Sequence, residues 1–196
     1  MARDLSPRLD APEEEVGAGP DDAALALAAR RDRRQFVHLY ERYADRLFRY
    51  AKARTGSATA ADDIVSETML SAMEDLRRFD PARGSFAGWL FGIAAHELSA
   101  RERRRGRLRR AIARMWAPDT AEDDALDSLI RYEDVLLARR LLAILSPADR
   151  EVVLLRYSAG LRATEIAEAL GISHGAARMR LSRALQRMAV ELGDDR

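Results

Sequence analysis

The chain has 196 residues, of which 47% are hydrophobic and 33% are charged, and its formal net charge is +1. A chain of this length forms one or two small domains, and its wealth of Ala, Leu, Arg and Glu favours helices. It has no cysteine, which excludes disulfides and thiolate metal sites, and its three histidines (His38, His96 and His174) are far apart in sequence, so we infer neither a metal nor a cofactor. No apolar run approaches the ~18 residues of a membrane span, and the N-terminus lacks the apolar core of a signal peptide, so we expect a cytoplasmic protein without membrane insertion.

Charges of the two signs are segregated along the chain. Residues 1–24 are acidic, contain three prolines and carry few large apolar groups, which predicts a disordered tail. Seven arginines against one glutamate occupy residues 101–110, and residues 118–127 are acidic again. The basic block indicates contacts with a polyanion. The acidic blocks indicate either that the chain covers its own basic surface or that it docks on another protein.

Periodicity predicts a first helical module over residues 25–110. Three apolar stripes at helical spacing run through it, and a Gly56-Ser57 break and the turn at 79–85 separate them. The stripes consist of Phe36, Leu39, Tyr40, Tyr43, Leu47 and Ala51, then Ala61, Ile64, Val65, Thr68, Ala72 and Leu76, and finally Phe86, Trp89, Leu90 and Ile93.

A flexible linker over residues 111–129 is expected next, because this stretch loses clear pattern and holds a proline and five acids. A second helical module over residues 130–196 follows it. Ser146 and Pro147 supply a cap and a first-turn proline inside this module. The apolar residues around that helix start are Leu137, Leu141 and Leu145 before it and Val152, Val153 and Leu155 after it. The expected fold class is therefore all-α, with two small helical domains.

Residues 161–183 predict a helix, a turn and a second helix rich in arginine, which is a geometry that reads DNA. Gly171 permits the backbone that ends the first helix, and the Ser173 hydroxyl caps the second. The packing residues are Ile166, Ala167 and Leu170 in the first helix and Ala177, Leu181, Ala184, Leu185 and Met188 in the second. The opposite face presents Gly175, Arg178, Met179 and Ser182, with Arg183 on its shoulder. A plain helical hairpin is the alternative interpretation.

The same stretch matches G-x-S-x-G, the motif of serine hydrolases, at residues 171–175. That motif works only on a sharp turn between a buried strand and a helix. The preceding segment, EIAEAL, is rich in Ala and Glu with a period of 3.6, which predicts a helix. We therefore expect Ser173 to be a cap, and no catalytic residue is predicted.

Together these segments resemble the extracytoplasmic-function (ECF) sigma factors, the minimal two-domain form of the bacterial sigma family. The resemblance covers about residues 33–192. In order and spacing, four signatures match regions 2.1 to 2.4 and region 4 of that family: FVHLYERYADRLFRYA, AADDIVSETML, RRFDPARGSFAGWLFGIA with the following ERRR, and LSPADREVVLLRYSAGLRATEIAEALGISHGAARMRLSRAL. The resemblance implies a non-catalytic factor that binds core RNA polymerase, recognises the −35 and −10 promoter elements and promotes DNA melting.

The resemblance also implies roles for particular residues. Asp62, Asp63 and Glu67 match the segment that docks on the β′ clamp helices, although acids in a first helical turn also suit the macrodipole of any exposed helix. Region 4 is implied to contact the β flap. The −10 DNA contacts implied are Phe79, Asp80, Arg83, Ser85, Arg101, Arg103, Arg104 and Arg105. The −35 DNA contacts implied are His174, Gly175, Arg178, Met179, Ser182 and Arg183.

The expected partners are core RNA polymerase, promoter DNA and an anti-sigma factor, with the chain itself a monomer. The anti-sigma factor is inferred from the apolar and basic surfaces that two linked domains would expose when free of polymerase. A stand-alone helix-turn-helix regulator is the alternative function, and it would bind duplex DNA alone and dimerise. The sequence departs from the family at His96, Ala100, Arg162 and Met179. Arg162 stands at the usual capping position of the first reading helix, which leaves Thr164 as the candidate cap.

Overall fold

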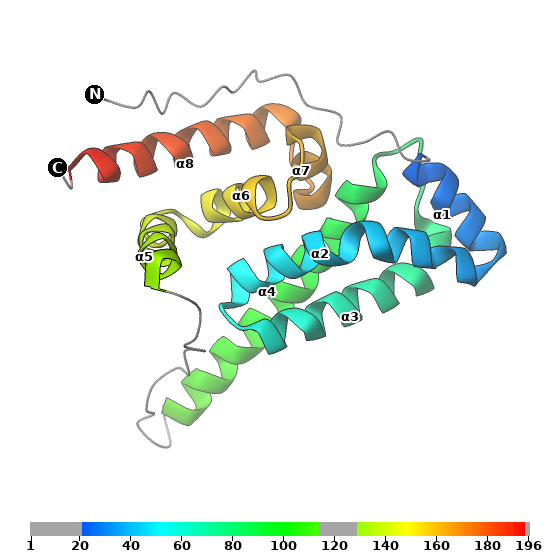
Figure 1. The fold of residues 1–196 in the computed structure, drawn as a ribbon, viewed down its shortest axis with the longest axis horizontal. Coiled ribbons are helices and arrows are strands. Elements are labelled where there is room, and N and C mark those ends of the chain that lie inside the picture. The colour runs from blue at the N-terminus through cyan, green and yellow to red at the C-terminus, as the bar shows by residue number, and fades with distance from the viewer. Residues whose placement is uncertain (1–20, 114–128, 195–196) are drawn as a thin grey trace.

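The computed structural model describes residues 21–113 and 129–194, and every regular element in them is helical, which confirms the predicted all-α class. The first module comprises α1 (Asp22–Arg31), α2 (Phe36–Thr55), α3 (Ala58–Glu74) and α4 (Phe86–Ala113), with short 3-10 helices at Arg33–Gln35 and Leu76–Arg78. The second comprises α5 (Leu129–Ala143), α6 (Pro147–Tyr157), α7 (Ala163–Leu170) and α8 (His174–Asp194) (Figure 1).

The helix ends of the first module follow the local sequence. Gly56 ends α2 with a φ of 75°, a value that favours glycine, and the Ser57 hydroxyl caps α3 by accepting from the Ala60 N–H at 3.2 Å. The predicted stripes form the core, except that Tyr40 is 47% exposed. The prediction for Tyr40 is wrong because periodicity identifies a helix face but does not show how widely a neighbour covers it.

Helix α1 was not predicted, and it moves the boundary of the acidic tail. The tail was expected to reach residue 24, but α1 begins at Asp22, where the Asp21 side chain caps it. The Asp22 carboxylate accepts a hydrogen bond from the Tyr43 hydroxyl and pairs with Arg42, which fastens α1 to α2. Burial, with the Asp22 carboxylate nearby, raises the pKa of Tyr43. Residues 1–20 of the predicted tail lie outside the described residues.

In the second module α6, α7 and α8 pack together, and α5 lies against α8. The Ser146 hydroxyl accepts from the Asp149 N–H at 3.2 Å and Pro147 opens α6, which confirms the predicted helix start. Leu137 in α5 is 37% exposed, because α5 has few neighbours. Most of the predicted linker, residues 114–128, lies outside the described residues.

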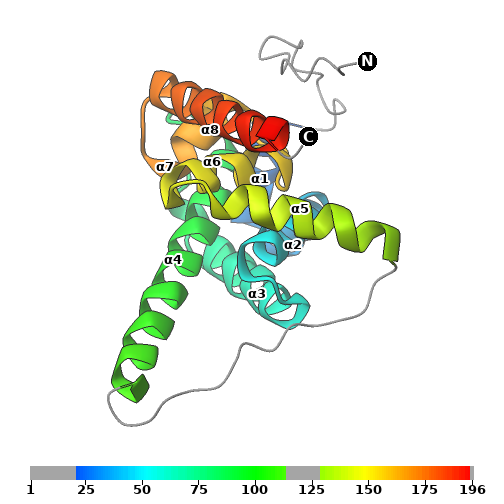
Figure 2. The same ribbon diagram turned by 90° about the vertical axis from the view of Figure 1, so that its left-hand side faces the viewer.

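The two modules pack against each other and share one continuous apolar core. Helix α7 lies along α4, α6 contacts α2, and the C-terminal part of α4 extends beyond the other helices (Figure 2). This corrects the expectation that both modules leave large apolar surfaces open, because part of that surface is buried between them.

Candidate nucleic-acid and polymerase interfaces

Helix α8 is held by one side and exposed on the other. The Ser173 hydroxyl accepts from the Ala176 N–H at 3.2 Å, which confirms the predicted cap, and Gly171 ends α7 with a φ of 61°. Of the predicted −35 residues, His174, Gly175, Arg178 and Arg183 are exposed, Met179 is 63% exposed and Ser182 is half-buried. The buried side of α8 consists of Ala177, Leu181 and Ala184. The helix therefore exposes most of the predicted residues on one side.

Helix α7 begins differently from the prediction. Its N-cap is Arg162, and Thr164 lies inside the helix. The Glu165 carboxylate reaches back and accepts from the Arg162 N–H at 2.8 Å and from its guanidinium at 3.1 Å. Glu165 is the third residue of α7. Its carboxylate satisfies the N–H of the N-cap residue at a helix start that has no Ser or Thr cap. The motif at 171–175 connects two helices, so Ser173 lacks the strand that a hydrolase elbow requires.

Arg183 is tied to its own module. Its guanidinium lies 3.8 Å from the carboxylate of Asp149, which is buried, and Arg187 lies 3.4 Å from the same carboxylate. The Arg183 side chain is still 56% exposed, so it can contact a phosphate at the edge of the α8 face.

The loop at 79–85 is fixed by aromatic packing and by a turn. Phe79 is 3% exposed, and its ring lies 5.4 Å from that of Phe86 and 5.5 Å from that of Trp89. Asp80 accepts from the Ala82 N–H at 3.0 Å and remains exposed, as does Arg83. The Phe79 ring belongs to the core beneath the loop, while Asp80 and Arg83 face solvent, and the −10 contact of Phe79 stays a prediction.

Ser85, the last predicted residue of this loop, is engaged by the other module. Its N–H and hydroxyl both donate to the Glu168 carboxylate of α7, at 2.8 and 2.6 Å. The two groups that could hydrogen-bond a base or phosphate are therefore occupied within the chain.

The predicted polymerase-binding acids and one predicted DNA-binding arginine meet. Asp62, Asp63 and Glu67 are exposed on α3, and the Arg101 guanidinium lies 3.3 Å from Asp63 and 3.2 Å from Glu67. Exposed ion pairs of this kind contribute little to stability and exchange readily. The other arginines of the set, Arg103, Arg104 and Arg105, are exposed on the extended part of α4.

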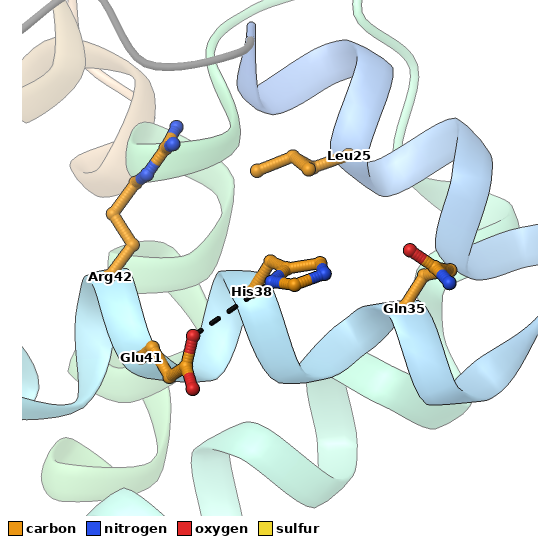
Figure 3. A pocket seen from close by; sticks show the side chains of 5 residues that line it. All are labelled: Leu25, Gln35, His38, Glu41 and Arg42. Atoms are coloured by element: carbon orange, nitrogen blue, oxygen red, sulfur yellow. Dashed lines mark ion pairs between the residues drawn. The ribbon is translucent and has the colours of Figure 1, made fainter.

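A hollow of about 610 Å³ lies between α1 and α2, away from all predicted sites. Figure 3 shows that Leu25 and Gln35 line it together with His38, Glu41 and Arg42, and His38 lies 3.8 Å from Glu41. No cluster of three or more His, Cys, Asp or Glu side chains suited to a metal ion occurs in residues 21–113 and 129–194.

Comparison with known proteins identifies the family. Residues 39–110 match sigma-70 region 2, and residues 136–188 match sigma-70 region 4. The chain is 33% identical over 179 residues to the ECF RNA polymerase sigma factor SigD of Mycobacterium tuberculosis, covering 87% of this chain and 83% of the relative. It is also 33% identical over 180 residues to SigL of the same species, covering 90% and 96%. This chain belongs to the ECF sigma factors.

Two solved structures resemble this ECF sigma factor over both modules. CnrH in complex with the cytosolic domain of CnrY has a TM-score of 0.68 at 26% identity, covering 89% of this chain and 99% of CnrH. The sigma factor RpoE in complex with the anti-sigma factor NepR from Bartonella quintana has a TM-score of 0.63 at 25% identity, covering 82% and 98%. The stand-alone regulator is not favoured by these comparisons. No helix in the described parts of this sigma factor is long and apolar enough to cross a membrane.

Sequence reasoning missed Glu168 and the glycines that face it. An added Cβ on Gly88 would lie 2.7 Å from the Glu168 Cβ, and one on Gly92 would lie 3.3 Å from the Ala169 carbonyl oxygen. The spacing of Gly88 and Gly92, four residues apart, was a visible signal, because residues four apart share a helix face. Nothing in the sequence identified which segment occupies that face.

Proposed function

We propose that this sigma factor binds core RNA polymerase as a monomer, directs it to promoters through −35 and −10 contacts, helps to melt the duplex and then dissociates. Asp62, Asp63 and Glu67 dock on the β′ clamp helices, and region 4 meets the β flap. Polymerase carries out the chemistry.

The observation that carries this proposal is the two-sided character of α8. A buried apolar side and a capped N-terminus fix the helix, while His174, Gly175, Arg178 and Met179 face outward together. An arginine in this position can bind guanine O6 and N7 through two parallel hydrogen bonds, which identify the base.

The −10 element is assigned to the loop at 79–85 and the basic end of α4. When the −10 element melts, a base that leaves the duplex loses its stacking and pairing, which costs a few kcal/mol. Contacts between that base and the protein must offset this cost. Asp80 and Arg83 supply polar groups at the loop, and the exposed Arg103, Arg104 and Arg105 supply phosphate contacts farther along α4.

An anti-sigma factor is proposed as a further partner. Both similar structures described above are complexes, and the RpoE partner is named as an anti-sigma factor. Because the chain has no cysteine, any thiol or thiolate-zinc redox switch lies in that partner. Oxidant treatment of the purified sigma factor alone should leave its DNA activity unchanged, and a change would contradict this assignment.

Reconstitution tests the main proposal. The purified chain is mixed with core polymerase from a related bacterium, and holoenzyme formation and promoter-directed transcription are measured. We expect tight promoter binding only with core polymerase present. Tight binding of the chain alone to duplex DNA as a dimer, with no affinity for core polymerase, would instead establish the stand-alone regulator.

A further inference from the structure

One buried carboxylate holds two arginines of α8. The Asp149 side chain, in the first turn of α6, is 7% exposed, and one of its oxygens lies 3.8 Å from the Arg183 guanidinium. Its other oxygen accepts a hydrogen bond from the Arg187 guanidinium at 3.4 Å. The two arginine side chains are nevertheless 56% and 55% exposed. The carboxylate therefore contacts each guanidinium from inside the module, while much of each side chain stays accessible from outside.

This pairing keeps two like charges close together at the surface. Arg183 and Arg187 are four residues apart on α8, and like charges at this spacing destabilise a helix by themselves. The Asp149 carboxylate bridges the two guanidinium groups and offsets their repulsion. The position of the carboxylate is fixed in turn, because the Ser146 hydroxyl accepts from the Asp149 N–H at 3.2 Å and caps α6.

Two neighbouring arginines of this kind suit a phosphate group. A guanidinium has five N–H donors, so a contact with one carboxylate oxygen leaves donors for a second acceptor. Phosphate oxygens accept from arginine through parallel, charge-assisted hydrogen bonds, whose geometry the planar guanidinium matches. With two positive charges and one negative charge, the cluster of Asp149, Arg183 and Arg187 keeps a net positive charge.

The place of the cluster along α8 favours the DNA backbone over the bases. The N-terminal residues of a reading helix contact base edges in the major groove, which is about 12 Å wide. Arg187 follows His174, the first residue of α8, by thirteen residues, or about 20 Å along the helix axis. This turn of α8 therefore lies past the groove, where the sugar–phosphate backbone borders it. Arg183 lies one turn earlier on the same side of the helix.

We propose that Asp149 is a positioning residue for −35 binding, and that the two arginines it holds, Arg183 and Arg187, form a site for one backbone phosphate of the DNA. This inference rests on the proposed function and adds Arg187 to the residues that contact the promoter. Asp149 acts through the two guanidinium groups, which it keeps in the orientation that a phosphate requires. Its own negative charge repels DNA, so its removal weakens binding only if this orientation matters.

Asp149→Asn separates positioning from charge. The substitution keeps the shape of the side chain and makes the net charge of the chain more positive by one, so a purely electrostatic effect would tighten DNA binding. We expect instead that binding weakens about two- to fivefold, the range for the loss of one exposed ion pair. The measurement is the Kd of the reconstituted holoenzyme for a labelled promoter duplex. Unchanged or tighter binding would overturn the positioning role.

Two comparisons separate this role from a purely structural one. Ser146→Ala removes the cap of the same helix start but leaves the carboxylate, so its holoenzyme should keep nearly the promoter affinity of the parent. In a chain that already carries Arg183→Ala and Arg187→Ala, Asp149→Asn should cause no further loss. If Ser146→Ala weakens binding as much, or if the loss persists without the arginines, Asp149 supports only the fold of region 4 and the positioning role is wrong.

Arg187→Ala tests the phosphate site at an exposed position, where folding does not depend on the side chain. It should reduce the slope of log Kobs against log salt concentration by about 0.9, the value for one phosphate contact. Arg34→Ala is the matched control, because it removes the same charge from an exposed arginine of the first module. Equal slopes in the parent and Arg187→Ala would overturn the phosphate site. If the parent forms no holoenzyme, the proposed function is wrong and this inference falls with it, whereas a parent that binds its promoter without these differences refutes the inference alone.

Discussion

The outer face of α8 and the loop at 79–85 are both assigned to promoter DNA, but their surroundings differ. The α8 face is exposed along its first turns, with Met179 63% exposed, and the apolar residues that fix the helix lie on the opposite side. At the loop, Phe79 is buried and Ser85 is hydrogen-bonded to Glu168. One surface is open to solvent, whereas part of the other is buried or hydrogen-bonded within the chain. The acids proposed to bind polymerase resemble the loop, because Arg101 already pairs with two of them.

The largest effect is expected from reversing the acids on α3. Asp62→Lys, Asp63→Lys and Glu67→Lys together should abolish holoenzyme formation, because they reverse the charge of the proposed docking face and remove the carboxylates that pair with Arg101. Helical content should remain, because all three side chains are exposed. The measurement is the Kd for core polymerase, with Asp45→Lys and Glu74→Lys as an exposed-acid control. An unchanged Kd would refute the docking assignment.

Glu151→Ala should weaken the contact between the modules. It leaves the Tyr50 hydroxyl without its acceptor and removes one of the two carboxylates that contact Arg54, whose other partner is Glu102. Loss of one partner from a buried pair costs about 3–5 kcal/mol, and the remaining Glu102 contact reduces this to about 2–4 kcal/mol. Urea unfolding measures the loss. The control is Glu191→Ala, which removes an exposed pair with Arg140 and should cost below about 1 kcal/mol. Equal losses in stability for the two variants would show that the Glu151 contacts between the modules contribute no more than an exposed ion pair.

Arg178→Ala and Arg183→Ala should change DNA binding in different ways. Removing Arg178 should relax preference at one or two base pairs of the −35 element, a loss of about 1–3 kcal/mol of discrimination. Removing Arg183 should weaken all sequences about equally and lower the salt dependence of binding by about one phosphate contact. Transcription from a randomised −35 library, repeated at several salt concentrations, separates the two. An unchanged base profile for Arg178→Ala would mean that α8 is not placed in the groove as assigned.

Ser173→Ala should produce the smallest effect. It removes the hydroxyl that caps α8 and should destabilise the helix start by about 1 kcal/mol, weakening −35 binding without changing base preference. Ser173→Asp restores a capping oxygen and is the control. If both substitutions weaken binding equally, the hydroxyl contacts DNA rather than the helix.

Local chemistry was predictable from sequence, and the association of the modules was not. Gly56, Gly171, Ser146 and Ser173 mark helix ends by backbone and capping properties that act within a few residues, and all four were identified. The contact between Ser85 and Glu168 joins residues 83 positions apart, which no local pattern encodes. The error at Tyr40 has a related cause, because burial depends on a neighbour that periodicity does not reveal. Helix α1 was missed because its small apolar residues follow an acidic segment.

The glycines inside α4 also carry a consequence for how such a factor can change over generations. Gly88 and Gly92 each weaken the helix by roughly 0.5–1 kcal/mol relative to alanine. One added methyl group would strengthen α4 and push α7 away in the same step. Point mutations at these two codons can therefore change how closely the two modules pack, while every residue assigned to read the promoter stays the same.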